Sequence, residues 1–122
     1  GLFTTLLTLA EEGDDVLLPD PGWANYPPMV HAIGARAIFY PLDPAQADAA
    51  LTFLCTPGSA RGFVPKERIA GLRLASTDSD FVLGEGPEVS GPGAALLLAL
   101  TGRRRGLDDL AGDGLTLLRA RA

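Results

Sequence analysis

Side chains with reactive groups are few in this sequence and lie far apart. The chain contains one lysine, Lys66, one histidine, His31, and one cysteine, Cys55. No basic residue adjoins Cys55 to lower the thiol pKa, so we interpret it as a small buried hydrophobic residue. A single histidine excludes a three-histidine zinc site within the chain, and we predict no metal site. We interpret Lys66 as a solvated loop lysine.

Two aromatic residues stand where they could bind a flat ligand. Trp23 and Tyr26 follow a short apolar segment, Asp15–Leu18, and a turn of sequence Pro-Asp-Pro-Gly at residues 19–22. An aromatic ring in such a loop can stack on an electron-poor ring and hold its orientation. The simpler interpretation of Trp23 is that its ring covers the local core.

A run of three arginines is the other candidate. Arg103, Arg104 and Arg105 follow an apolar stretch, residues 94–100. A guanidinium group can donate two parallel hydrogen bonds to a carboxylate, which is the chemistry that this run offers. The alternative is that Arg103 satisfies the last carbonyl groups of a helix over the apolar stretch.

Two further patterns have structural explanations. Residues 84–91 are glycine-rich, but Pro87 lacks the N–H group that a phosphate loop would use, so we predict a turn. The acidic pair Asp108 and Asp109 lacks the alternating oxygen ligands of a calcium loop. It is better explained as capping a helix start.

Composition excludes several classes of protein. The chain has 122 residues, 47% of them hydrophobic, with a mean hydropathy of +0.19, which is enough apolar material for a core. A formal net charge of −5 argues against binding of nucleic acid. No apolar stretch approaches the length of about 18 residues that crosses a membrane, and no signal peptide is visible. The single cysteine fits a reducing compartment, so we predict a cytoplasmic protein.

The patterning predicts an α+β fold in two parts. Residues 1–44 indicate a helix over 2–10, a strand over 15–18, a helix over 23–33 and a strand over 35–40, an incomplete α/β fragment. Residues 45–122 indicate a small α+β domain with short antiparallel strands and helices. Its expected elements are a short helix over 48–55, strands over 69–77 and 81–83 that form a hairpin, a short extended piece over 88–90, and helices over 94–100, 107–110 and 115–121. Residues 45–50 are the predicted seam between the parts.

The first part resembles class I and II, fold-type I aminotransferases. The resemblance is carried by residues 12–26 (EGDDVLLPDPGWANY) within residues 1–41. It implies that Trp23 stacks on pyridoxal phosphate and that Tyr26 lies beside it, so these two are our candidate cofactor-binding residues. The family's chemistry needs a lysine for the Schiff base, an acidic partner for the ring nitrogen and an arginine for the substrate carboxylate. Lys66 stands in a setting (GFVPKER) unlike the family's lysine motif.

The second part resembles the C-terminal domain of mycothiol-dependent maleylpyruvate isomerase-like proteins. The resemblance covers about residues 50–121. Five segments carry it: residues 63–65 (FVP), 71–81 (GLRLASTDSDF), 84–92 (GEGPEVSGP), 95–103 (ALLLALTGR) and 107–114 (LDDLAGDG). The family places this domain after a DinB-like helical bundle that holds a divalent metal and mycothiol, and its proteins come largely from actinobacteria. The resemblance implies that an arginine faces a dicarboxylate substrate. Arg103 is therefore our candidate catalytic residue, and Arg104 and Arg105 compete for the role.

The predicted function follows from these two resemblances. Our first interpretation is an accessory C-terminal domain of a maleylpyruvate isomerase-like protein, without catalysis of its own and with no cofactor in this chain alone. The alternatives are a truncated class I/II aminotransferase without its Schiff-base lysine, or a non-functional fusion. Possible partners are a DinB-like bundle supplied in trans, or a second copy that pairs through exposed strand edges. We predict no nucleic acid and no membrane as partners.

Overall fold

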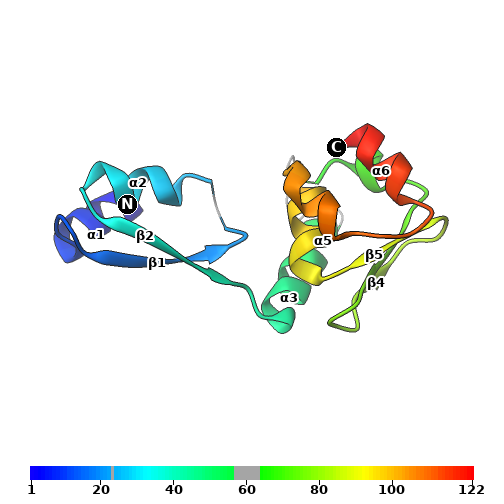
Figure 1. Ribbon diagram of the computed structural model, residues 1–122, viewed down its shortest axis with the longest axis horizontal. Helices are drawn as coiled ribbons and strands as arrows, with labels where there is room; N and C mark the ends of the chain where they lie inside the picture. Colours follow the sequence, from blue (N-terminus) through cyan, green and yellow to red (C-terminus); the bar gives the residue numbers. More distant parts are fainter. Residues whose placement is uncertain (23, 57–63) are drawn as a thin grey trace. The chain divides into compact units, whose positions relative to one another are not determined.

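The computed structural model describes residues 1–22, 24–56 and 64–122. These residues form two compact units, Gly1–Leu42 and Asp43–Ala122. Both units combine helices with short strands in small sheets (Figure 1), which confirms the predicted α+β class. None of the described helices is long and apolar enough to cross a membrane.

The first unit alternates helices and strands, as predicted. Its elements are α1 (Leu2–Leu9), β1 (Asp15–Asp20), α2 (Tyr26–Ala32) and β2 (Arg36–Pro41). The two strands are parallel, with Asp15 beside Arg36 and Asp20 beside Pro41. β1 continues through Pro19, where the prediction ended the strand at Leu18. Proline is tolerated there because the position faces away from β2, so its missing N–H removes no bond of the ladder.

Only one face of this two-stranded sheet is covered. Leu18 on the sheet packs with Val30 of α2 and with Ala35 in a small buried cluster, against which Leu6 of α1 also packs. Leu17 and Ile38, neighbours in register on the opposite face, are 67% and 42% exposed. Parallel sheets are normally covered on both faces, so this unit carries an unusually bare apolar surface for its size.

The second unit contains most of the buried residues. Its elements are α3 (Pro44–Cys55), α4 (Lys66–Ile69), β3 (Arg73–Ser76), β4 (Val82–Leu83), β5 (Glu88–Gly91), α5 (Gly93–Leu100), the 3-10 helix η1 (Arg104–Asp109) and α6 (Leu115–Arg121). The strand order is β4-β3-β5; β3 pairs antiparallel with β4 and parallel with β5. The antiparallel β3–β4 pair confirms the predicted hairpin.

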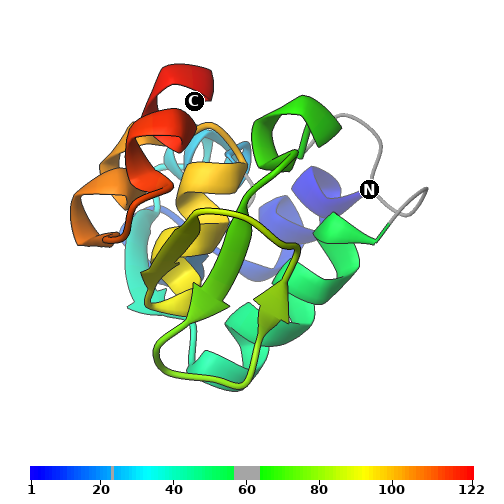
Figure 2. The same cartoon turned by 90° about the vertical axis from the view of Figure 1, so that its right-hand side faces the viewer.

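Helix α5 is the centre of this unit. Apart from Ala94, every residue from Gly93 to Leu100 is buried, because η1, α3 and the strands β3 and β5 pack around the helix (Figure 2). Residues 45–50, the predicted seam, are helical and belong to α3. A capping box at Asp43 and Gln46 starts α3 at Pro44, and Ala47 and Leu51 of α3 are buried. Those two side chains help to cover α5.

A carboxylate from the β3–β4 turn caps the start of α5. The N–H of Gly93 and the hydroxyl of Ser76 both donate to Oδ1 of Asp78, at 2.9 and 2.7 Å. The residue before the helix, Pro92, offers no side-chain cap. The hydrogen bond from Gly93, and then that from Ser76, favour the charged carboxylate and hold the pKa of Asp78 below its usual value. The stabilisation is therefore present at neutral pH and is lost as the pH falls through the folded-state pKa.

We expect Asp78→Ala to lower the free energy of unfolding of the second unit by about 1 kcal/mol at neutral pH, the usual size of a lost helix cap. The difference from the unsubstituted protein should shrink in acid, where the carboxylate is protonated in both states. Amide hydrogen exchange along α5 measures both effects. Asp80→Ala, in the same turn and exposed, is the matched control. Equal losses from both variants at every pH would contradict the capping role.

Gly106 of η1 lies close against helix α5. A Cβ atom at this position would lie 2.5 Å from the carbonyl oxygen of Ala95 and 2.6 Å from Cβ of Leu98. Glycine therefore lets η1 lie directly on α5, and any side chain would push the two helices apart.

We expect Gly106→Ala to destabilise the second unit by about 1–3 kcal/mol through overpacking. Asp108→Ala, an exposed position on the same 3-10 helix, should change stability by less than about 0.5 kcal/mol. Urea unfolding followed by circular dichroism compares the two. A Gly106→Ala variant as stable as the unsubstituted protein would contradict the requirement for glycine between η1 and α5.

Candidate functional site

The aromatic candidates lie where the chain leaves β1 and enters α2. Trp23 is outside the described residues. Tyr26 is the first residue of α2, which begins here because Pro27 and Pro28 fit the unpaired first turn of a helix. Tyr26 is half-buried and packs against the cluster of Leu18, Val30 and Ala35. At least part of this ring is thus engaged in the core of the first unit.

The ion pair between Arg36 and Asp15 lies away from this loop, whereas Asp20 directly precedes it at the end of β1. Arg36 at the start of β2 pairs with Asp15 at the start of β1, with 2.8 Å between Nε and Oδ1. Because the strands are parallel, this pair stands at their amino ends, whereas the loop before Tyr26 follows the carboxyl end of β1. His31, in the last turn of α2, is exposed. Over the described ranges, no three His, Cys, Asp or Glu side chains gather as metal ligands.

The three arginines of the run have different surroundings. Arg103 precedes η1, is half-buried, and its backbone N–H donates to the carbonyl of Leu98 at 2.8 Å. Arg104 is exposed and donates from Nη2 to the backbone oxygen of Ala122 at 3.3 Å. Arg105 is also exposed. Arg104 also borders a shallow hollow of about 220 Å³, together with Leu107, Asp108 and Arg119.

An arginine that the sequence analysis missed supplies a side-chain donor at the end of α5. Nη1 of Arg68, in α4, donates to the carbonyl of Leu100 at 2.5 Å, and Nε of the same side chain is buried without a partner among the described residues. Arg121 of α6 in turn donates to the carbonyl of Ala70 at 2.6 Å. Arg68 thus bonds one of the last carbonyl groups of α5. No local pattern marks Arg68, because its acceptor lies 32 residues away.

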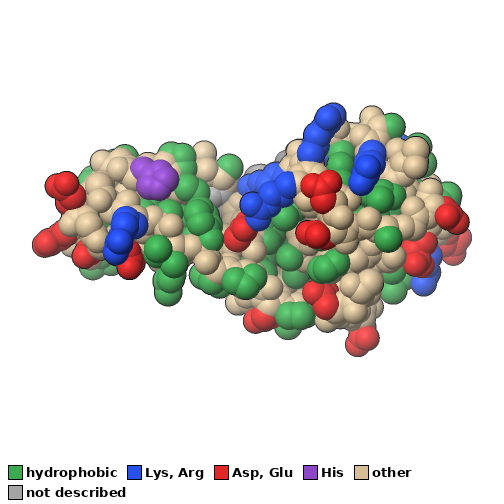
Figure 3. All heavy atoms as spheres, in the orientation of Figure 1, with side chains coloured by type: hydrophobic (Ala, Val, Ile, Leu, Met, Phe, Trp, Pro, Cys, Tyr) green, Lys and Arg blue, Asp and Glu red, His purple; other side chains and the backbone are tan. Residues whose placement is uncertain are grey.

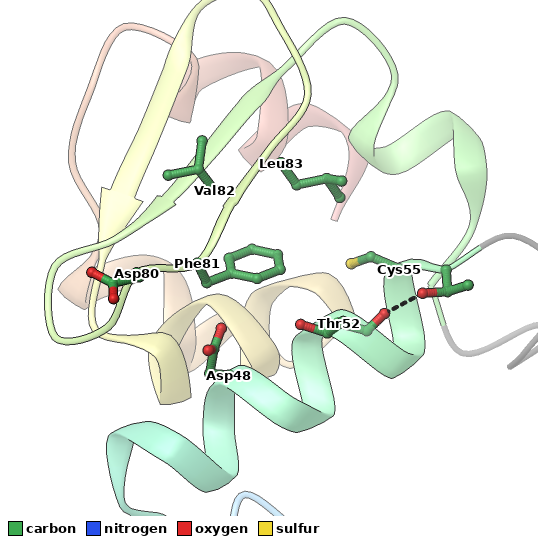
Figure 4. A pocket seen from close by; sticks show the side chains of 8 residues that line it. Asp48, Thr52, Cys55, Asp80, Phe81, Val82 and Leu83 are labelled. Atoms are coloured by element: carbon green, nitrogen blue, oxygen red, sulfur yellow. Dashed lines mark hydrogen bonds between the residues drawn. The ribbon is translucent and has the colours of Figure 1, made fainter.

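Another hollow of the second unit lies between α3 and β4. It measures about 390 Å³, and Figure 4 shows the ring of Phe81 and the thiol of Cys55 at its wall. The other lining residues are Asp48, Thr52, Thr56, Asp80, Val82 and Leu83. Cys55 is half-buried rather than fully buried as we predicted. With two carboxylates and no described cation in its lining, the hollow is unsuited to an anionic ligand.

Burial raises the pKa of the Cys55 thiol, so the thiol is protonated and weakly nucleophilic at neutral pH. We expect iodoacetamide to alkylate Cys55 more slowly in the folded protein than in urea, and the rate to rise only at more alkaline pH. Mass spectrometry after timed quenching measures this. A folded protein that reacts as fast as the unfolded chain at neutral pH would contradict the shielded thiol.

Comparison with known proteins identifies the class of the first part of the chain. Residues 1–57 match the family model of aminotransferase class I and II. This part of the chain is therefore similar to class I and II aminotransferases, in agreement with the resemblance that the sequence indicates for residues 1–44, and the similarity extends over α3.

One relative is an aspartate aminotransferase from Musicola paradisiaca (strain Ech703). It is 44% identical over 42 residues, which are 34% of this chain and 10% of that protein. This chain thus matches only about a tenth of the length of that relative. No solved structure matches the chain. The matches favour the aminotransferase alternative over our first interpretation, and they give no support to the maleylpyruvate isomerase-like assignment.

Proposed function

We propose that residues 1–57 are an aminotransferase-type segment whose loop at residues 21–26 forms one wall of a pyridoxal phosphate site. The observation that carries the proposal is the position of this loop. It follows the carboxyl end of β1 and leads into α2, and open α/β sheets bind ligands at the carboxyl ends of their parallel strands. The match to class I and II aminotransferases supports the same assignment.

The described residues do not make up a complete site for this cofactor. Its chemistry needs a lysine for covalent attachment, an acid near the ring nitrogen and cationic groups for the phosphate and the substrate. Lys66 is exposed at the first position of α4 and lies in the other unit. Arg36 is held by Asp15 at the opposite ends of the strands from the loop. We therefore derive no catalytic step and expect no transamination by these 122 residues alone.

The finer assignments remain proposals. Trp23 would supply the ring that stacks on the cofactor. Tyr26, which packs against the core of the first unit, would hold the start of α2 in place. The isomerase-like identity of residues 45–122, with Arg103 facing a carboxylate and a DinB-like bundle as partner, has no observation in its favour beyond the sequence pattern. The cytoplasmic location likewise remains a prediction.

A segment exchange tests the proposed wall. Residues 1–57, which match the family model, replace their counterpart in the aspartate aminotransferase of Musicola paradisiaca. We expect the chimera to bind pyridoxal phosphate and to transaminate. Trp23→Ala in the chimera should raise the cofactor's dissociation constant by about two- to tenfold, because a lost ring stack costs about 0.5–1.5 kcal/mol. Equilibrium dialysis of the cofactor measures the change.

The control for this exchange is Phe3→Ala, an exposed apolar position on α1 away from the loop, which should leave cofactor binding unchanged. A folded chimera that does not bind the cofactor would overturn the proposal. Transamination by the unmodified chain of 122 residues, with no other protein added, would overturn the expected lack of independent activity.

A further inference from the structure

The hollow between α3 and β4 is bounded by one face of a helix and by one strand with its preceding turn. Positions 48, 52 and 55 of α3 are three or four residues apart, so their side chains lie along the same face of the helix. Residues 80–83 form the other side of the hollow. α3 packs against α5 through a neighbouring face, on which Leu51 is buried. The hollow is therefore a space beside the core of the second unit that the described side chains leave open.

Two carboxylates that line the hollow have no partner. Asp48 is half-buried and Asp80 is exposed. Over the described ranges, neither side chain forms a hydrogen bond or an ion pair. Other acidic side chains nearby are engaged, since Asp43 caps α3 and Asp78 caps α5. A carboxylate that is partly withdrawn from water is stabilised by a cationic hydrogen-bond donor.

Most of the remaining wall is apolar. The ring of Phe81, only 8% exposed, and the thiol of Cys55 border the hollow (Figure 4). In the same view the carboxyl groups of Asp48 and Asp80 lie toward one end, and Cys55 and Leu83 lie toward the other. Small-molecule sites measure about 300–1,000 Å³ and combine an apolar lining with a few polar groups. At about 390 Å³, the hollow has the size and the lining of such a site.

The charge around the hollow selects a cation. α3 has no basic side chain, and acidic rather than basic side chains lie over it on the face drawn in Figure 3. No described cation lines the hollow, and the chain as a whole has a formal net charge of −5. The electrostatic potential therefore favours a positively charged ligand and disfavours an anion.

We propose that the hollow between α3 and β4 binds a small primary amine with an apolar body. The ammonium group donates hydrogen bonds to the carboxylates of Asp48 and Asp80, and the apolar body lies against the ring of Phe81. An uncharged apolar molecule would leave both carboxylates without a partner. A metal ion would leave the apolar wall unused, and no three His, Cys, Asp or Glu side chains gather for one among the described residues. The proposal does not depend on the proposed wall of a pyridoxal phosphate site.

Titration of the full chain with phenethylamine tests the ligand class. In NMR spectra of the backbone amides, we expect the signals of the residues that line the hollow to shift with one common dissociation constant in the millimolar range. Phenethyl alcohol replaces the ammonium group by a hydroxyl and should bind about tenfold more weakly, because it forms no charged hydrogen bonds. Phenylacetate should not bind. Equal affinities for the amine and the alcohol, or no shifts with the amine, would overturn the proposal.

Asp48→Asn and Asp80→Asn test the two carboxylates, since each removes one charge and keeps the shape of the side chain. Each should weaken phenethylamine binding by about two- to tenfold. The double variant should bind the amine no better than the alcohol. Asp113→Asn removes the same charge from an exposed position outside the lining and is the matched control. Equal losses from all three single variants would mean that only the overall charge matters, which contradicts the site.

Two further measurements locate the bound amine. Thr52→Trp places a large ring in the hollow from an exposed position of α3 and should block binding with both carboxylates intact. Ala49→Trp, at an exposed position of the same helix outside the lining, should leave binding unchanged. Saturating phenethylamine should also slow the alkylation of Cys55 by iodoacetamide, at an alkaline pH where the amine stays protonated. Binding that survives Thr52→Trp, or that leaves the alkylation rate unchanged, would place the amine elsewhere and overturn the proposal.

Discussion

The burial of α5 is the constraint on which the second unit depends. The sequence of this helix, Gly-Ala-Ala-Leu-Leu-Leu-Ala-Leu, has no polar side chain on any face. Such a helix can lie only where protein covers it on nearly every side. The covering elements come from the whole unit: α3 before it, the strands β3 and β5, and η1 after it. Side chains distant in the sequence form hydrogen bonds with the backbone at its two ends: Asp78 accepts from the first N–H group and Arg68 donates to the last carbonyl group.

Elements with strong local signals could be predicted from the sequence, and those set by distant contacts could not. The helix over residues 94–100, the helix over 115–121 and the hairpin all lie within a few residues of their predicted positions. They are marked by apolar runs and by glycine or proline at their ends. The roles of Asp78 and Arg68 were not predictable, because their partners lie 15 and 32 residues away. The start of α3 at Pro44, rather than at the predicted residue 48, could have been predicted, because Asp43 and Gln46 form a capping box.

Packing explains part of the sequence of both segments that carried the resemblances. The turn-rich pattern of residues 84–92 contributed to the resemblance to isomerase-like proteins, yet packing alone explains part of it. Gly86 has a φ of +130°, and a Cβ there would lie 2.3 Å from the carbonyl oxygen of Gly71. Any chain that crosses β3 so closely needs glycine at this point. The segment around Trp23 lies within residues 1–57, which match the family model of aminotransferase class I and II. Packing explains part of that sequence too, since a Cβ at Gly22 would lie 2.5 Å from the carbonyl oxygen of Pro19.

Helix α3 belongs to two different descriptions of this chain. By similarity it falls in the segment that matches aminotransferases, which runs to residue 57. By packing it belongs to the second unit, where Ala47 lies against Gly93 of α5. The aminotransferase-like segment therefore ends after α3, whereas the second compact unit begins before it. A recombination event that moved the aminotransferase-like segment as a block would strip α5 of its neighbour, so the two halves are not interchangeable modules.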